Sequence, residues 1–140
     1  MAPVPGVKRL VVNVDGGARG NPGPAAIAAV ASDGKGEILA ERSERIGEAT
    51  NNVAEYRALL LGIELARGLG ADEVELVGDS ELIVRQVKGE YKVKQEHLRP
   101  LHRQVREALE GFQRWSIRHV KRDENARADE LLNEALDAAS

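Results

Sequence analysis

The sequence contains no cysteine and few aromatic residues. Without cysteine it has no disulfide framework, no thiolate metal site and no cysteine nucleophile. Aromatic residues make up only 3% of the chain, so Ala, Leu and Val must fill the core that a hydrophobic content of 42% allows. A length of 140 residues is typical of one domain. We therefore expect a single domain over residues 1–140, with an ordered core at about 7–137.

Long apolar runs and an excess of basic charge are also missing. No apolar run approaches the roughly 20 residues of a membrane-spanning helix, and the first residues, MAPVPGVKR, lack the apolar centre of a signal peptide. We therefore expect a cytoplasmic protein with no membrane partner. The formal net charge is −3, so any binding to nucleic acid requires a local site rather than an overall basic surface.

The hydrophobic pattern predicts an α/β fold with the element order βββαβααβα. Strands are expected at 8–14, 25–32, 37–46, 73–79 and 115–121, and helices at 52–68, at 80–89, from about 95 and from about 125. Successive strands followed by strands separated by helices indicate a five-stranded mixed sheet flanked by helices.

A stretch rich in glycine and proline, VDGGARGNPGPAA (14–26), follows the first predicted strand. Such turns often hold phosphate groups. Here Ala18 stands where the G-x-G-x-x-G fingerprint requires glycine, and the G-K-[ST] ending of a P-loop is missing. The stretch is therefore neither of these two nucleotide-binding loops.

Four acidic residues are expected at ends of strands and beginnings of helices: Asp15, Glu55, Asp79 and Asp129. Each has a structural explanation when taken alone. Asp15 suits an Asx-turn, and Glu55 suits a capping pair with Asn52. Asp79 suits a helix N-cap, and Asp129 suits the positive end of a helix dipole. Taken together, however, the four side chains are expected to meet at one edge of the sheet.

A cluster of four carboxylates needs a cation, because mutual repulsion otherwise raises the pKa of some of them. Ligands that are all oxygen suit Mg²⁺ or Mn²⁺ rather than Zn²⁺. Two such ions about 3.5–4 Å apart are a usual arrangement for in-line attack on a phosphodiester. The pattern is therefore typical of two-metal phosphodiester hydrolysis.

Four blocks of the sequence resemble the signature blocks of type 1 ribonuclease H: VDGGARGNPGPAA, TNNVAEYRALLLGIELA, VGDSELIV and NARADELLNEA. The resemblance implies an RNase H-like fold and a metal-dependent endoribonuclease. Such an enzyme hydrolyses the RNA strand of RNA–DNA hybrids and leaves 5′-phosphate and 3′-hydroxyl ends. It also implies that two Mg²⁺ or Mn²⁺ ions are held by the catalytic residues Asp15, Glu55, Asp79 and Asp129.

The resemblance further implies a set of contacts with the hybrid. Thr50 and Asn21 match positions that hold a DNA phosphate, and backbone groups of the glycine turn would contact the 2′-hydroxyls that distinguish RNA from DNA. The implied substrate-binding residues are Gly16, Gly17, Ala18, Arg19, Asn21, Thr50 and Asn51. No protein partner is indicated, so we expect a monomer.

Two features depart from the family pattern. Many members carry a histidine in a loop before the last helix; here Arg122 and Asp123 occupy that region, and His119 lies earlier, in a predicted strand. Some members also insert a basic helix that grips the hybrid. Here the neighbouring helices are joined directly, and the remaining basic patch consists of Lys88, Lys92 and Lys94.

Other functions stay open at this point. Another nuclease of the superfamily, such as a resolvase or exonuclease, is disfavoured by the TNN and GNPGP segments. A non-catalytic hybrid-binding module is disfavoured because every expected acid is present. Related domains also occur fused to others, so the chain fits one domain of a longer polypeptide as well.

Overall fold

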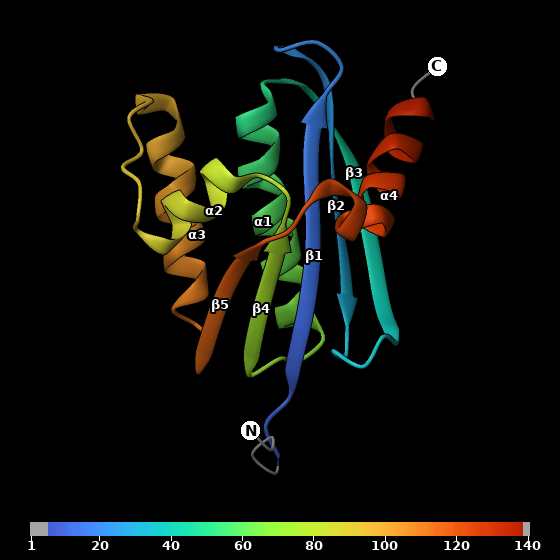
Figure 1. The fold of residues 1–140 in the computed structure, drawn as a ribbon, viewed down its shortest axis with the longest axis vertical. Coiled ribbons are helices and arrows are strands. Elements are labelled where there is room, and N and C mark those ends of the chain that lie inside the picture. The colour runs from blue at the N-terminus through green and yellow to red at the C-terminus, as the bar shows by residue number, and fades with distance from the viewer. Residues whose placement is uncertain (1–5, 139–140) are drawn as a thin grey trace.

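The computed structural model describes residues 6–138 and contains one five-stranded sheet with the order β3-β2-β1-β4-β5 (Figure 1). The pairs β1–β2 and β2–β3 are antiparallel, whereas β1–β4 and β4–β5 are parallel. The predicted mixed sheet is therefore confirmed. The strands are β1 (Arg9–Ala18), β2 (Gly23–Ser32), β3 (Ile38–Ala49), β4 (Glu73–Gly78) and β5 (Arg114–His119).

Four α-helices follow in the predicted order. Thr50 begins α1 by accepting a hydrogen bond from the Val53 N–H at 3.2 Å, and Ser80 begins α2 in the same way with Ile83 at 3.4 Å. Short 3₁₀ turns at Glu96–Leu98 and Arg122–Asn125 precede the last two helices. The helices are α1 (Asn51–Gly68), α2 (Glu81–Lys88), α3 (Arg99–Leu109) and α4 (Ala126–Asp137).

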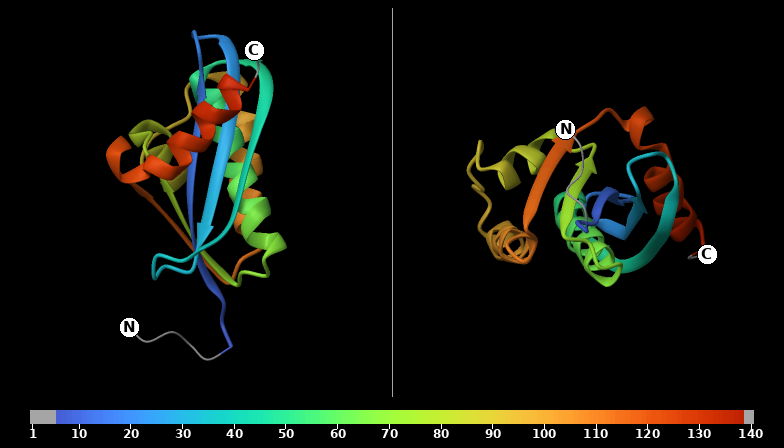
Figure 2. Two further views of the ribbon diagram at one scale, coloured as in Figure 1. Left: turned by 90° about the vertical axis from the view of Figure 1, so that its right-hand side faces the viewer. Right: turned by 90° about the horizontal axis from the view of Figure 1, so that it is seen from below.

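The sheet separates two hydrophobic clusters of different size. The larger one joins one side of the sheet to α1, α2 and α3, and it includes the fully buried Tyr56 and Leu76. The smaller one joins the other side to α4 alone, and Figure 2 shows α4 across the sheet from α1. Its buried residues are Ala26, Ala28, Val30, Ala128, Leu131, Leu132 and Leu136.

The first strand is longer than the sequence predicts. Instead of ending at Asp15, β1 keeps its pairing with β2 as far as Ala18. Gly16 permits this arrangement because helix α1 lies directly against it: a Cβ at this position would lie 2.2 Å from the Ala54 carbonyl oxygen. The turn comes after Ala18, where Gly20 adopts a φ of 98°, a conformation that favours glycine.

Candidate active site

Strands β1 and β4 separate at the centre of the sheet. Their parallel pairing ends at Asn13 and Val77; beyond it β1 continues beside β2, while the chain leaving β4 turns into α2. A cleft opens at this point, as is common where strand connections leave a sheet in opposite directions. It is lined by Val14, Asp15, Glu55, Leu59, Gly78, Asp79, Ser80, Ile83 and Val84.

Three of the four predicted acids, Asp15, Glu55 and Asp79, line this cleft, and Asp129 interacts with Asp15 from α4. Asp15 lies within β1 and is only 5% exposed, and Asp79 directly follows β4. Glu55 lies one turn into α1 rather than in its first turn, and Asp129 lies in the first turn of α4, as predicted. Electrostatic interactions link Asp15 to each of the other three. The four carboxyl groups therefore lie near enough for the other three to affect Asp15, while their role as metal ligands stays a prediction.

For three of the four acids, the structure rules out the turn or capping role that the sequence alone allowed. Asp15 lies in a paired strand rather than an Asx-turn, because β1 continues past it. The N-caps of α1 and α2 are Thr50 and Ser80, so neither Glu55 nor Asp79 serves as a cap or capping partner. Only the position of Asp129 near a helix N-terminus matches its structural explanation.

Burial and crowding change the acidity of Asp15. Its pKa is raised from 3.8 to about 8; loss of solvent is the largest cause, and repulsion by Asp79 and Asp129 contributes to the same rise. A hydrogen bond shared with Asp129 and repulsion from Glu55 act in the same direction. Without a cation, Asp15 therefore tends to hold a proton at neutral pH.

The pKa of Glu55 is also raised, but by less than that of Asp15. Its pKa is raised from 4.5 to about 7, with burial as the largest cause and the Asp79 carboxylate contributing to the rise. The Ser80 hydroxyl, which donates a hydrogen bond to Glu55, and the nearby positive charge of Arg122 act in the opposite direction. The 3₁₀ turn before α4 thus places the positively charged Arg122 side chain near the carboxylates.

Two buried carboxylate oxygens of the cluster, Asp15 Oδ2 and Glu55 Oε2, have no hydrogen-bond partner. Buried carboxyl oxygens without partners are costly unless a cation or a hydrogen-bond donor reaches them. Within residues 6–138, no three His, Asp or Glu side chains are already gathered in a geometry that would hold a metal ion. Repulsion between like charges opposes such a closed arrangement when no cation is bound.

Comparison with known proteins places this chain in a family. Residues 13–135 match the family model described as "Reverse transcriptase-like". A protein of Halobacterium salinarum named ribonuclease HI is 50% identical over 131 residues, which cover 94% of this chain and 66% of that protein. The crystal structure of RNase H1 from this archaeon has a TM-score of 0.91 and 48% identity, covering 93% of this chain and 98% of that one. The chain belongs to the ribonuclease HI family.

Two further relatives show how this domain occurs elsewhere. LC11-RNase H1, crystallised in complex with an RNA/DNA hybrid, has a TM-score of 0.88 and 48% identity, with 93% of this chain and 98% of that one covered. A bifunctional protein of Mycobacterium tuberculosis is 44% identical, but the chain covers only 36% of it. The predicted RNase H-like fold is confirmed by these likenesses. The curated relatives named here are longer than the chain.

The residues that the ribonuclease HI resemblance assigns to the hybrid lie at one end of the sheet. Asn51 accepts a hydrogen bond from the Ala18 N–H at 2.8 Å, and its own backbone N–H donates to Asn21 at 3.1 Å. The Arg19 N–H donates to the Pro24 carbonyl at 2.8 Å. The amides of Ala18 and Arg19 therefore already have hydrogen-bond partners within the protein.

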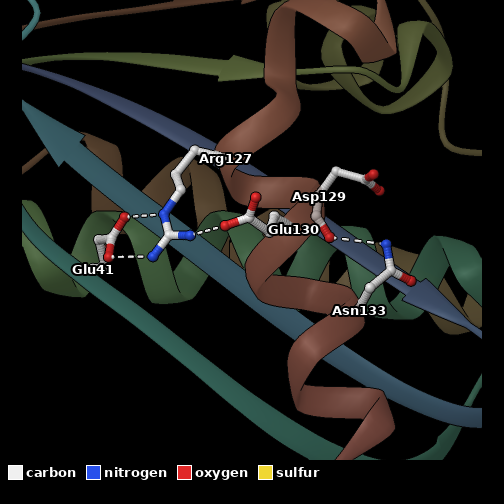
Figure 3. Close-up of polar contacts among 5 residues, drawn as sticks. All are labelled: Glu41, Arg127, Asp129, Glu130 and Asn133. Carbon is white, nitrogen blue, oxygen red and sulfur yellow. Dashed lines mark hydrogen bonds and ion pairs between the residues drawn. The ribbon is translucent and has the colours of Figure 1, made fainter.

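Helix α4 carries Asp129. An ion pair between Arg127 of this helix and β3 anchors the helix to the sheet. Arg127 donates to both carboxylate oxygens of Glu41 in β3, at 2.5 and 2.9 Å, and also pairs with Glu130 (Figure 3). Its hydrogen bond to Glu41 lowers the pKa of that carboxyl. In Figure 3 the Asp129 carboxylate lies away from this pair, so the same helix turn carries both the anchoring ion pair and an acid that interacts with Asp15.

The structure describes both segments at which the sequence departs from the resembled pattern. His119 is exposed at the end of β5, paired with Gly78 of β4, and the chain then enters α4 through the 3₁₀ turn. Between α2 and α3 it passes through a short loop and the other 3₁₀ turn. The predicted basic patch remains a prediction; all three of its side chains are exposed: Lys88, Lys92 and Lys94.

Sequence reasoning missed one polar group of the site. Asn125 is 1% exposed, and its Nδ2 donates to the Val14 carbonyl at 2.9 Å and faces Asp79 Oδ2 at 3.4 Å. Its Oδ1 accepts from Asn13 Nδ2 at 3.0 Å. Two signals in the sequence could have found it: Asn125 is the first residue of the block NARADELLNEA, and Asn13 is a polar residue within the apolar run RLVVNV.

Proposed function

We propose that the chain is a metal-dependent endoribonuclease that hydrolyses the RNA strand of RNA–DNA hybrids, leaving 5′-phosphate and 3′-hydroxyl ends. Membership of the ribonuclease HI family supports this activity. The hybrid in the LC11-RNase H1 crystal supports the choice of substrate, because that relative shares the fold along almost its whole length.

In this proposal Asp15, Glu55, Asp79 and Asp129 hold two Mg²⁺ or Mn²⁺ ions. The observation that carries it is the pair of buried carboxylate oxygens without partners, set among further carboxylates. Such a set of hard oxygen donors fits either ion. When bound, divalent ions there would lower the pKa of water and stabilise the departing oxyanion.

The chain's own residues orient these ligands and the hybrid. Ser80 donates a hydrogen bond to Glu55, and the pairing of β1 with β2 fixes the backbone at Asp15. Thr50 accepts from Val53 through its hydroxyl oxygen, so the hydroxyl hydrogen remains to donate to a DNA phosphate. The proposed substrate contacts are Gly16, Gly17, Ala18, Arg19, Asn21, Thr50 and Asn51.

We also propose a single domain over residues 1–140 that acts as a cytoplasmic monomer. The lack of cysteine, which suits a reducing compartment, supports the location. Within the described residues, none of the helices combines the length and apolarity needed to cross a bilayer.

Cleavage of a labelled RNA–DNA hybrid, with and without Mg²⁺ or Mn²⁺, tests the proposal. We expect metal-dependent cutting of the RNA strand only, with single-stranded RNA and duplex DNA left intact. Cutting of duplex DNA would favour another nuclease of the superfamily. Tight binding of the hybrid without cleavage at any metal concentration would instead indicate a non-catalytic binding module.

A further inference from the structure

Asn125 stands where three parts of the active site meet. It immediately precedes α4, it contacts the backbone of β1 beside Asp15, and it faces the carboxylate of Asp79. At 1% exposure it is also among the most buried polar side chains of the described residues. A buried amide remains in such a place only if its hydrogen bonds are satisfied.

The orientation of this amide is forced by its neighbours. The Val14 carbonyl can only accept, so Asn125 must present its NH₂ group there. The same group has a second hydrogen, which faces Asp79 Oδ2. The Oδ1 atom must then face Asn13, and Asn13 must in turn present its own NH₂ group. Reversing the Asn125 amide would set its oxygen against a carbonyl and a carboxylate.

We propose that Asn125 is a positioning residue for the metal ligand Asp79, and that Asn13 fixes the Asn125 amide in the orientation that this task requires. The inference rests on the proposed metal site. One nitrogen ties Asp79 to the backbone of the strand that carries Asp15, so the two carboxylates keep a fixed relative position at the place where β1 and β4 separate. Outer hydrogen bonds of this kind orient metal ligands and affect metal affinity.

Asn125→Ala tests this role, with Leu136→Ala as a matched control. Leu136 is buried on the same helix, in the smaller cluster, so its loss loosens α4 without removing a polar contact of the cleft. We would measure thermal stability, the midpoint of a Mg²⁺ titration followed by NMR without substrate, and kcat on a hybrid. For Asn125→Ala we expect the Mg²⁺ midpoint to rise by about 10- to 100-fold, as for other outer-ligand changes. For the control we expect a change below about twofold.

A Mg²⁺ midpoint for Asn125→Ala within about twofold of wild type would overturn the inference. If Asn125→Ala does not fold, Asn13→Ala removes only the group that orients the amide. It should raise the Mg²⁺ midpoint by a smaller factor and shift the side-chain NH₂ signals of Asn125; no change in either would also overturn the inference. Failure of the wild-type chain to bind Mg²⁺ would instead overturn the proposed function itself.

Discussion

The two sides of the sheet support the active site with very different amounts of hydrophobic contact. Among the described residues, the cluster on the α1 side contains 24 buried residues, and the cluster on the α4 side contains seven. Glu55 and Asp79 adjoin elements of the larger cluster, whereas Asp129 lies on the helix that the smaller cluster holds. Polar contacts add to the weaker side: the Arg127–Glu41 pair and the buried Asn125 both anchor the segment around the start of α4.

This difference suggests that the four acids are not equally fixed. Elements with fewer buried apolar contacts open more easily by local unfolding. Helix α4 should therefore be the part of the active site that moves most readily, and its position relative to β1 should depend on a few polar contacts.

The largest effects are expected from the acids themselves. Asp79→Asn keeps the side-chain shape but removes a charge, so kcat on a hybrid should fall by about a thousandfold, or roughly 4 kcal/mol of barrier. Asp129→Asn should also lower kcat, but by a smaller factor, because α4 is less firmly held. Folding should survive in both variants, which circular dichroism would check. Equal losses at the two positions would contradict the proposed difference between the sides.

Core substitutions compare the two sides directly. Leu76→Ala, on the α1 side, should lower the free energy of unfolding by about 4 kcal/mol, toward the upper end for buried leucines. Leu132→Ala, on the α4 side, should cost about 2 kcal/mol. Urea denaturation gives both values. Hydrogen exchange should show Leu132→Ala acting mainly on α4, and uniform exchange throughout the chain would count against the comparison.

The cluster of acids should make stability depend on pH when no metal is present. The pKa values of Asp15 and Glu55 are raised in the folded state, to about 8 and about 7. Their stabilising contribution is complete below their unfolded pKa values and is lost as pH rises through the folded ones. In chelator, the free energy of unfolding should thus fall between about pH 4 and pH 8. Asp15→Asn should flatten this fall in urea titrations, and an unchanged slope would contradict the assigned cause.

The smallest effect on kcat is expected for a substitution in β5, the edge strand next to β4. His119 is exposed at the end of this strand, beside the position that precedes Asp79. A histidine that carries protons would give a kinetic pKa near 6.5. We expect no essential histidine, so His119→Ala should lower kcat at saturating Mg²⁺ by less than about tenfold, or 1.4 kcal/mol. A larger drop at unchanged thermal stability would identify His119 as the proton-transfer group.

The family and the element order could be predicted because each depends on local pattern or on motif residues, whereas the four acids as metal ligands stay a prediction. The extent of β1 could not, since its pairing past Asp15 depends on α1 lying against Gly16. Asn125 was missed for a similar reason. Its partner Val14 lies 111 positions away, and no spacing rule connects a residue before a helix to a carbonyl in the first strand.

Proton release on metal binding tests the central claim, that buried carboxylates form a site for divalent ions, most directly. With the pKa values of Asp15 and Glu55 at about 8 and about 7, Asp15 is mostly and Glu55 about half protonated at pH 7, and a bound cation must displace these protons. We would titrate Mn²⁺ into the substrate-free protein in weak buffer at pH 7 and measure the protons released. The account predicts release of about one proton per site for the wild type and much less for Asp15→Asn. Mn²⁺ binding without proton release, or equal release by both proteins, would contradict it.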